Sequence, residues 1–358
     1  MSNKYISVII ANYNNEPYLE KCLSSIIAQT HKYFEVVIVD DASTDNSLQI
    51  LNYFADKDDR IQIISNENNL GVAKSINKAI SLSSHDYLLR HDPDDYFVSN
   101  GFEVLLTTMS ESGADIVSGQ AIAFGSQRGE TQWPTSNREI MINLLIESPI
   151  HQPTALVKKS VFSDLKYKNV PSEDYDLWLR ALSCGFKFAN ASQVVSYYRR
   201  HSSNLTSIKK QEIFHEHIPV LRKNAVEIIR PSIDEVTKGI YSRALTKEGL
   251  DKNELTSINS VFEKIFYDYD DYSHQLKRRV SYYWMQIILA HGEYRFSNIK
   301  LFLQGNLKEN LSTFEKINIV LVSVLGVKFQ SPTYERLVKL RHSLRNLRLL
   351  ILGGENVK

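Results

Sequence analysis

The chain has 358 residues, which is long enough for two domains with at least one large core. Hydrophobic residues make up 43% and charged residues 23% of it, as in ordinary soluble globular proteins. The 42 Lys and Arg residues nearly balance the 41 Asp and Glu residues, so the overall charge argues against a nucleic-acid partner.

Strand and helix patterns alternate over the first ~120 residues. Buried strands are predicted at residues 6–10, 36–39, 61–64 and 87–89, and helices are predicted after the first, second and third of these strands. This order predicts right-handed crossovers and a mainly parallel sheet. Two further helices, at residues 138–146 and from residue 173 onward, and a strand at 194–198 complete the α/β pattern.

Beyond about residue 208 the periodicity is mostly helical and no strong strand is predicted. We therefore expect two domains, an α/β domain at residues 1–210 and a mostly helical domain at residues 211–358.

Cys22 and Cys184 are too few for a disulfide framework and are expected to be small core residues.

Three polar clusters directly follow predicted strands. They are Tyr13-Asn14, Asp40-Asp41, and the acidic turn Asp92-Pro93-Asp94-Asp95. Ligands of open α/β sheets bind beyond the carboxyl ends of the strands. The clusters are therefore expected to meet at one rim and to form a site there.

The acidic turn places three carboxylates within four residues, and such carboxylates repel one another unless a cation lies among them. Mg²⁺ or Mn²⁺ suits one or two carboxylates together with substrate phosphates. A solvated turn with a helix cap is the alternative.

Residues 11–15 contain no glycine, so a dinucleotide fingerprint and a P-loop are both absent, which disfavours dehydrogenases and kinases.

These segments together resemble the family-2 glycosyltransferases with a GT-A fold, including bacterial enzymes of surface-polysaccharide (O-antigen and capsule) assembly. The resemblance covers roughly residues 5–206, with its motifs in the family's order. The matching stretches are residues 7–14, 35–41 with Ser43, 69–71, 89–95, 172–178 and 198–206.

For the nucleotide-sugar donor, the resemblance implies that Tyr13 stacks on the base and that Asp41 hydrogen-bonds the edge of the base, as in enzymes that use uridine nucleotides. It implies that Asp92 contacts the ribose, and it places Ala11 and Asn14 in the same site. Many members of the family have an arginine just before the position of Asn77. This chain lacks it, and Lys74 and Arg90 are the candidate cations for the diphosphate.

For the metal and the chemistry, the resemblance implies that Asp94, with Asp95 as a further candidate, binds the Mn²⁺ or Mg²⁺ that bridges the diphosphate. His201 matches a histidine that contacts the metal or the diphosphate. Asp174 takes the place of the catalytic base, which removes the proton from the acceptor hydroxyl. His151, Thr154 and Glu173 are candidates for the acceptor pocket.

Each of these roles has a structural alternative. Asp174 can be a carboxylate that stabilises a helix N-terminus, and Asp41 can cap the helix that follows it. Tyr13 can be a packing residue, and His201 can belong to a surface basic cluster with Arg199 and Arg200.

The predicted function is an inverting, metal-dependent glycosyl transfer from a nucleotide-diphosphate sugar, expected to be UDP-linked. The acceptor is expected to be a glycan or a lipid-linked saccharide. The alternatives are a catalytically silent nucleotide-sugar-binding or scaffold protein and a nucleotidyltransferase.

The C-terminal stretch 336–351 has a basic amphipathic pattern. Five Lys and Arg residues and no acidic residue fall between Arg336 and Arg348, and leucines recur at three-four spacing. Such a helix can lie on an anionic membrane surface or can pack against protein. The N-terminus has no signal-peptide pattern, so we expect a cytoplasmic protein that is able to contact the inner face of the cell membrane.

Overall fold

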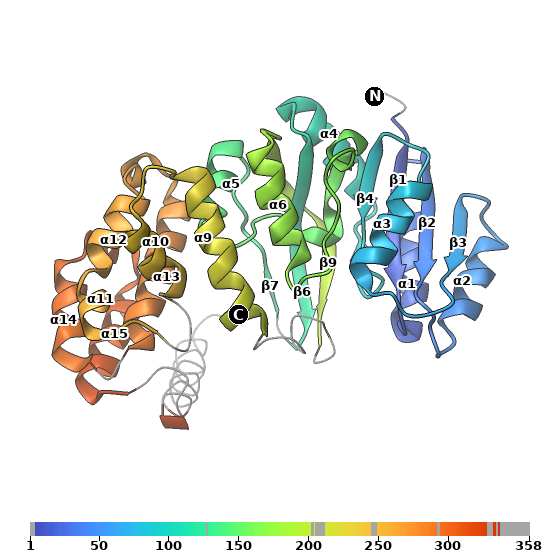
Figure 1. Cartoon of the computed structure of the whole chain (residues 1–358). Helices are drawn as coiled ribbons and strands as arrows, with labels where there is room; N and C mark the ends of the chain where they lie inside the picture. Colours follow the sequence, from blue (N-terminus) through green and yellow to red (C-terminus); the bar gives the residue numbers. More distant parts are fainter. Residues whose placement is uncertain are drawn as a thin grey trace, which may run out of the picture. The chain divides into compact units, whose positions relative to one another are not determined.

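The computed structural model describes residues 4–126, 128–201, 204, 212–244, 249–291, 294–327, 332–333 and 336. The chain forms two compact units, Met1–Pro231 and Ser232–Lys358 (Figure 1). The boundary predicted near residue 210 falls on residues 205–211, which lie outside the described residues. Helix α9 (Ile218–Ile229), which follows them, belongs to the first unit.

The described residues of the first unit form one sheet of nine strands in the order β3-β2-β1-β4-β8-β6-β9-β5, with β7 paired to β6. Strands β1 to β4 are mutually parallel, β8 is antiparallel to both of its neighbours, and β6 and β9 are parallel. The predicted mainly parallel α/β fold is therefore confirmed. The strands are β1 (Ile6–Asn12), β2 (Phe34–Asp40), β3 (Ile61–Ser65), β4 (Tyr87–Arg90), β5 (Tyr96–Phe97), β6 (Ile116–Gly125), β7 (Gly129–Glu130), β8 (Leu156–Lys158) and β9 (Phe188–Arg200).

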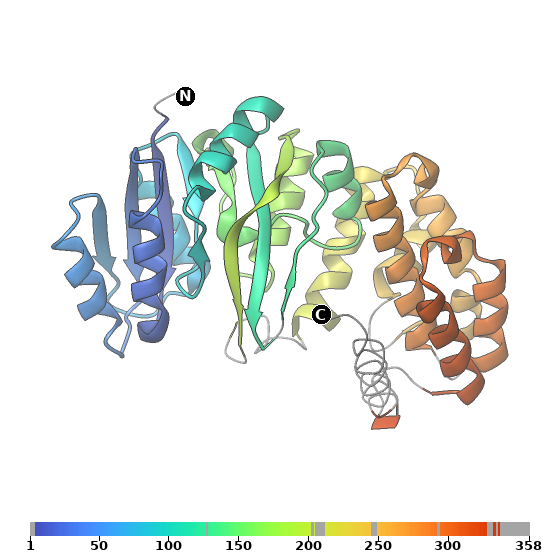
Figure 2. The ribbon, with the colours of Figure 1, turned by 180° about the vertical axis from the view of Figure 1, so that it is seen from behind.

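Helices cover both faces of this sheet. Helices α3 and α6 lie in front of it in Figure 1, and α1 and α4 lie in front of it in the reverse view of Figure 2. Strands β1 and β2 are buried almost throughout, as expected for parallel strands covered on two sides. The helices are α1 (Glu16–Ile27), α2 (Ser47–Ala55), α3 (Val72–Leu82), α4 (Gly101–Ser112), α5 (Asn137–Asn143) and α6 (Glu173–Ser183), with short helical turns η1 (Gln152–Thr154), η2 (Lys159–Phe162) and η3 (Ile213–His217).

The described part of the second unit consists of helices around its own core, in which Trp284 and Ile288 are fully buried. The prediction of a mostly helical C-terminal region is confirmed. No helix in the described residues is both long and apolar enough to span a membrane. Apart from Arg336, the predicted amphipathic helix at 336–351 lies outside the described residues. The helices are α10 (Glu235–Arg243), α11 (Lys252–Thr256), α12 (Ile258–Ile265), α13 (His274–Ala290), α14 (Arg295–Gln304) and α15 (Thr313–Leu325), with turns η4 (Tyr269–Asp271) and η6 (Asn306–Asn310).

Candidate active site

The three polar clusters singled out from the sequence follow three neighbouring parallel strands. Strand β1 lies between β2 and β4, so the segments that leave their carboxyl ends start at one edge of the sheet. Tyr13 follows β1, Asp41 follows β2, and the acidic turn follows β4. The topology thus brings donor-site candidates from distant parts of the sequence to one rim.

The loops after β1 and β2 are tied together by buried polar groups. Asp40 Oδ1 accepts hydrogen bonds from Asn12 Nδ2 at 2.8 Å and from Ser43 Oγ at 2.6 Å. The Asn14 N–H donates to Ser43 Oγ at 3.0 Å, with Asn14 in a left-handed conformation (φ 54°). Between these anchored residues the Tyr13 side chain is 46% exposed, and a planar ligand can stack on its ring.

Asp41 lies beneath the loop that leads into α3. Its carboxylate accepts hydrogen bonds from Asn66 Nδ2 (2.7 Å), from the Leu70 N–H (2.9 Å) and from the Gly71 N–H (2.8 Å). Burial alone would raise the pKa of Asp41, but these hydrogen bonds lower it below its usual value. Asp41 therefore fixes the loop at residues 66–71 and does not act as the cap of α2.

In the acidic turn, Asp94 faces a histidine and an amide that come from beyond β9. Asp94 Oδ2 lies 3.0 Å from His201 Nε2 and accepts a hydrogen bond from Asn204 Nδ2 at 3.0 Å. The Asp94 and His201 side chains are 15% and 21% exposed, and the His201 ring packs against Tyr18 with its centroid 5.3 Å away. Asn204 has no assigned role from the sequence, although it lies in the motif that contains His201.

Asp95 points in a different direction from Asp94. It is buried, and its Oδ1 accepts a hydrogen bond from the Arg199 N–H at 2.7 Å, which ties the turn to β9. Burial raises the pKa of Asp95, and the nearby Asp94 and Asp92 raise it further. Asp95 Oδ2 has no partner within the described residues.

The fit of this site to a divalent cation rests on Asp94 and His201. No group of three or more His, Cys, Asp and Glu side chains with the spacing of a metal site occurs among the residues that the structure describes. One carboxylate and one imidazole, both partly open to solvent, are a sufficient protein contribution for an ion that keeps waters and binds substrate phosphates. The two side chains therefore fit a cation that is shared with a ligand.

Arg90 lies at the end of β4 and joins the acidic turn to helix α6. Its Nη2 is 3.1 Å from Glu173 Oε1 and 3.6 Å from Asp92 Oδ1, and its guanidinium lies over the Tyr167 ring. With the Gln152 amide turned so that its oxygen faces Arg90, this oxygen is 3.0 Å from Arg90 Nη1. The Arg90 side chain is only 6% exposed. Sequence reasoning found Arg90 but not its bridging position, which depends on Tyr167 and Gln152.

Asp174 lies in the first turn of α6, which starts after Ser172 in a left-handed conformation (φ 58°). Its Oδ1 accepts a hydrogen bond from the Tyr175 N–H at 2.8 Å. Burial raises the pKa of Asp174 to about 6 and the neighbouring Glu173 adds to this effect, while Arg90 opposes it. Such a carboxylate is ionised at neutral pH and has a raised proton affinity, as a general base requires.

The acceptor candidates His151 and Thr154 differ in whether their polar side-chain atoms already have hydrogen-bond partners. Burial lowers the pKa of His151 to about 3, so its ring is neutral, and its Nε2 has no partner among the described residues. The Thr154 side chain is fully buried, and its hydroxyl donates to the His151 carbonyl at 3.0 Å. Thr154 thus supports the loop from within, and direct contact with an acceptor is not open to it in this conformation.

The remaining donor-site candidates are Ala11 and Lys74. Ala11 is half-buried in β1, opposite Val39 of β2. Lys74 is exposed in the first turn of α3, close in sequence to the loop that Asp41 holds. Of the two basic side chains that are candidates for contact with the diphosphate, Lys74 is therefore exposed and Arg90 is buried.

The sequence of the chain is similar to those of known glycosyltransferases. The model of glycosyl transferase family 2 matches residues 7–165. An uncharacterized glycosyltransferase of Haemophilus influenzae is 28% identical over 340 residues, covering 88% of this chain and 98% of that protein. An uncharacterized glycosyltransferase of Methanocaldococcus jannaschii is 30% identical over 226 residues, covering 60% of this chain and 78% of that protein.

One further relative has a name that states its donor and acceptor, and one solved structure resembles the fold. The Escherichia coli protein WfaP, a UDP-Glc:alpha-D-GlcNAc-diphosphoundecaprenol beta-1,3-glucosyltransferase, is 27% identical over 224 residues, with coverage of 59% of this chain and 83% of that protein. Among solved structures, residues 1–349 of S. aureus TarS superpose with a TM-score of 0.54 at 18% identity and cover 89% of this chain and 90% of that chain. At that identity the TarS match supports the fold alone.

Proposed function

The chain belongs to glycosyl transferase family 2, and from this premise we propose that it transfers a sugar with inversion from a UDP-linked donor to a saccharide hydroxyl, with a divalent cation at Asp94. The observation that carries the proposal is the position of Arg90. The buried Arg90 guanidinium connects Asp92 of the acidic turn with Glu173, the residue before Asp174. A donor-binding turn and a candidate base are thereby held on either side of one guanidinium.

In the proposed reaction Asp174 accepts the proton of the acceptor hydroxyl as the hydroxyl oxygen attacks the anomeric carbon. The bond from that carbon to the donor diphosphate breaks in the same displacement, so the anomeric configuration inverts. A bound Mn²⁺ or Mg²⁺ would neutralise charge on the departing diphosphate. Asp94 and His201 are the residues that would hold the cation, and Asp95 supports the turn from the buried side.

For the donor, we propose that Tyr13 stacks on uracil and that the loop held by Asp41 borders the edge of the base. The name of WfaP, which includes UDP-Glc, supports a UDP-linked sugar. Lys74 is proposed to face the diphosphate, because it is exposed at the start of α3, whereas the Arg90 guanidinium is already paired with carboxylates.

For the acceptor, we propose a saccharide carried on a lipid diphosphate in polysaccharide assembly. WfaP and a second Escherichia coli relative, WfgD, are both named for an acceptor on diphosphoundecaprenol. Glu173 and the neutral ring of His151 are proposed to border the acceptor. Contact of residues 336–351 with a membrane surface and a cytoplasmic location remain predictions from the sequence.

The central test is calorimetry with UDP-glucose, UDP-N-acetylglucosamine and UDP, each with Mn²⁺ and with EDTA. Metal-dependent binding of a uridine nucleotide is expected. The absence of metal-dependent binding by all three ligands would refute the proposed donor and cation site.

The role of Asp174 is tested by Asp174→Asn with Asp176→Asn as the matched control. Asp176 lies in the same helix but pairs with Arg180, away from Arg90. Asp174→Asn is expected to keep donor affinity and to lose transfer, while Asp176→Asn keeps both. The same measurements distinguish an enzyme from a catalytically silent nucleotide-sugar binder. Such a binder would show no transfer in the wild type, so neither substitution could change an activity.

A further inference from the structure

Helix α15 in the second unit presents an apolar face to solvent. Ile317, Leu321, Val324 and Leu325 are each slightly more than half exposed, and Val320 is 36% exposed. Their spacing of three and four residues places most of them on one side of the helix. The exposed side of a helix in a globular protein is normally polar, so contiguous apolar exposure marks a surface that contacts something else.

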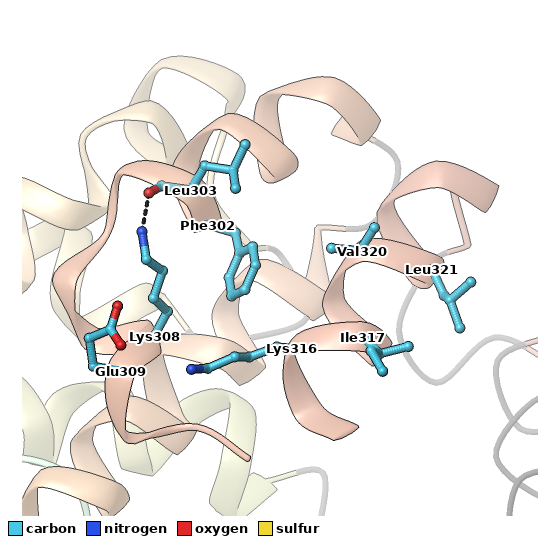
Figure 3. Close-up of a pocket in the computed structure, with 8 residues that line it drawn as sticks. All are labelled: Phe302, Leu303, Lys308, Glu309, Lys316, Ile317, Val320 and Leu321. Carbon is cyan, nitrogen blue, oxygen red and sulfur yellow. Dashed lines mark hydrogen bonds between the residues drawn. The ribbon is translucent and has the colours of Figure 1, made fainter. Parts of the chain in front are cut away.

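A groove of about 440 Å³ between α14 and α15 extends this apolar face. It is lined by Phe302 and Leu303 of α14 and by Ile317, Val320 and Leu321 of α15 (Figure 3). Lys308 from η6 and Lys316 from α15 flank the apolar side chains, and Lys308 donates a hydrogen bond to the Leu303 carbonyl. Glu309 also lines the groove, which thus combines an apolar floor with two ammonium groups and one carboxylate at its edge.

The charge of this part of the chain is strongly positive. Residues 295–348 contain ten Lys and Arg residues, three Glu residues and no Asp, although acidic and basic residues are balanced in the whole chain. One of the three glutamates, Glu315, is neutralised by Arg278 at 3.0 Å. Residues 295–327 hold four of these basic residues and two of the glutamates, and the larger part of the positive excess follows α15 in the sequence, at residues 328–348.

We propose that the apolar face of α15, with Lys308 and Lys316 beside it, docks on an anionic lipid bilayer surface. Apolar side chains flanked by lysines match the boundary between acyl chains and acidic headgroups. Another copy of this surface would bring like charges together, which opposes self-association. The inference deepens the proposed function, since it brings the enzyme to the surface that holds a lipid-linked acceptor, and in that respect it rests on that function.

The test is flotation of the full-length protein with vesicles of phosphatidylcholine alone or with one quarter phosphatidylglycerol. The wild type is expected to float with the anionic vesicles and to be released by 0.5 M salt. Leu321→Ser/Val324→Ser is expected to lower the partition coefficient about tenfold or more, since both apolar side chains leave the acyl boundary. Lys308→Glu/Lys316→Glu is expected to lower the partition coefficient about fivefold or more per lysine.

Val236→Ser is the matched control, because Val236 is an exposed apolar residue on α10 of the same unit and is expected to leave flotation unchanged. Wild-type flotation by Leu321→Ser/Val324→Ser overturns the proposal, as does a wild-type protein that stays with the soluble fraction. A dimer that light scattering detects in the wild type and that this variant abolishes also overturns it. Binding of UDP with Mn²⁺, measured on the same variants, reports on the donor site separately from the docking surface.

Discussion

Replacement of Arg90 by Gln tests whether this residue positions the catalytic groups or contacts the donor. The change removes a charge whose side chain is 6% exposed and leaves Glu173 and Asp92, which are 18% and 32% exposed, without their common partner. Breaking a fully buried ion pair costs roughly 3–5 kcal/mol. Because both carboxylates retain some contact with water, we expect a loss of about 2–3 kcal/mol in the free energy of unfolding of the first unit.

For a unit of this size the loss corresponds to a decrease in Tm of about 4–12 °C, which thermal unfolding followed by circular dichroism can measure. Arg180→Gln is the matched control. Arg180 pairs with Asp176 four residues earlier in the same helix, and loss of this pair is expected to cost about 0.5 kcal/mol.

Measurements of kcat and KM on Arg90→Gln distinguish a positioning role of Arg90 from direct contact with the donor. Arg90 opposes the rise in the pKa of Asp174, which burial brings to about 6, so without Arg90 the pKa of Asp174 rises further. The base is active when deprotonated, and the acidic limb of the kcat profile should therefore move to higher pH in Arg90→Gln. An unshifted acidic limb together with an increase in donor KM of about tenfold or more would refute this reasoning, and would show that Arg90 contacts the diphosphate.

Three further changes test the donor site. Asp94→Asn should lower Mn²⁺-dependent UDP affinity by about tenfold or more in calorimetry, and unchanged affinity would remove Asp94 from the cation site. Tyr13→Ala should weaken UDP binding about tenfold and Tyr13→Phe should not, since stacking requires the ring alone; equal losses would make the hydroxyl the important group. Asp41→Asn should lower the free energy of unfolding by about 1–3 kcal/mol at pH 7 in urea titrations. The pKa of Asp41 is lowered in the folded state, so its contribution is present above the unfolded value of about 3.9 and is lost as the pH falls below it. A deficit that persists undiminished at lower pH would contradict this assignment.

The central strands could be predicted from the sequence because they are continuous β-branched runs. Strand β2 is an example, with every residue from Val36 to Asp40 buried. Strands β6 and β8 were not predicted. Strand β6 includes polar and glycine residues, and β8 has only three residues, so both depend on pairing with partners distant in sequence. Local patterns do not report such pairings.

The motifs of the candidate site could be recognised in the sequence, but the orientations of their side chains could not. Asp94 and Asp95 are adjacent in a turn, and their side chains have different partners, His201 for Asp94 and the Arg199 N–H for Asp95. The sequence therefore could not distinguish the carboxylate that faces His201 from the buried one that holds Arg199. The contact of Asp94 with Asn204 spans 110 residues and became visible only in the folded chain.

The electrostatics of the site give a reason for the cation that does not depend on any resemblance. Asp92, Glu173 and Asp174 lie around the buried guanidinium of Arg90, whose charge Glu173 and Asp92 already share, and Asp94 lies close enough to Asp92 to raise the pKa of that carboxyl group. A diphosphate would add further negative charge to this excess of carboxylates, and like charges in a partly desolvated site repel strongly. Arg199 Nε already donates to the Asp94 carbonyl oxygen, and Lys74 is the exposed basic side chain proposed to face the diphosphate. We therefore propose that a cation held by Asp94 and His201 offsets this charge, and donor affinity is expected to depend on the metal far more steeply than the stability of the fold does.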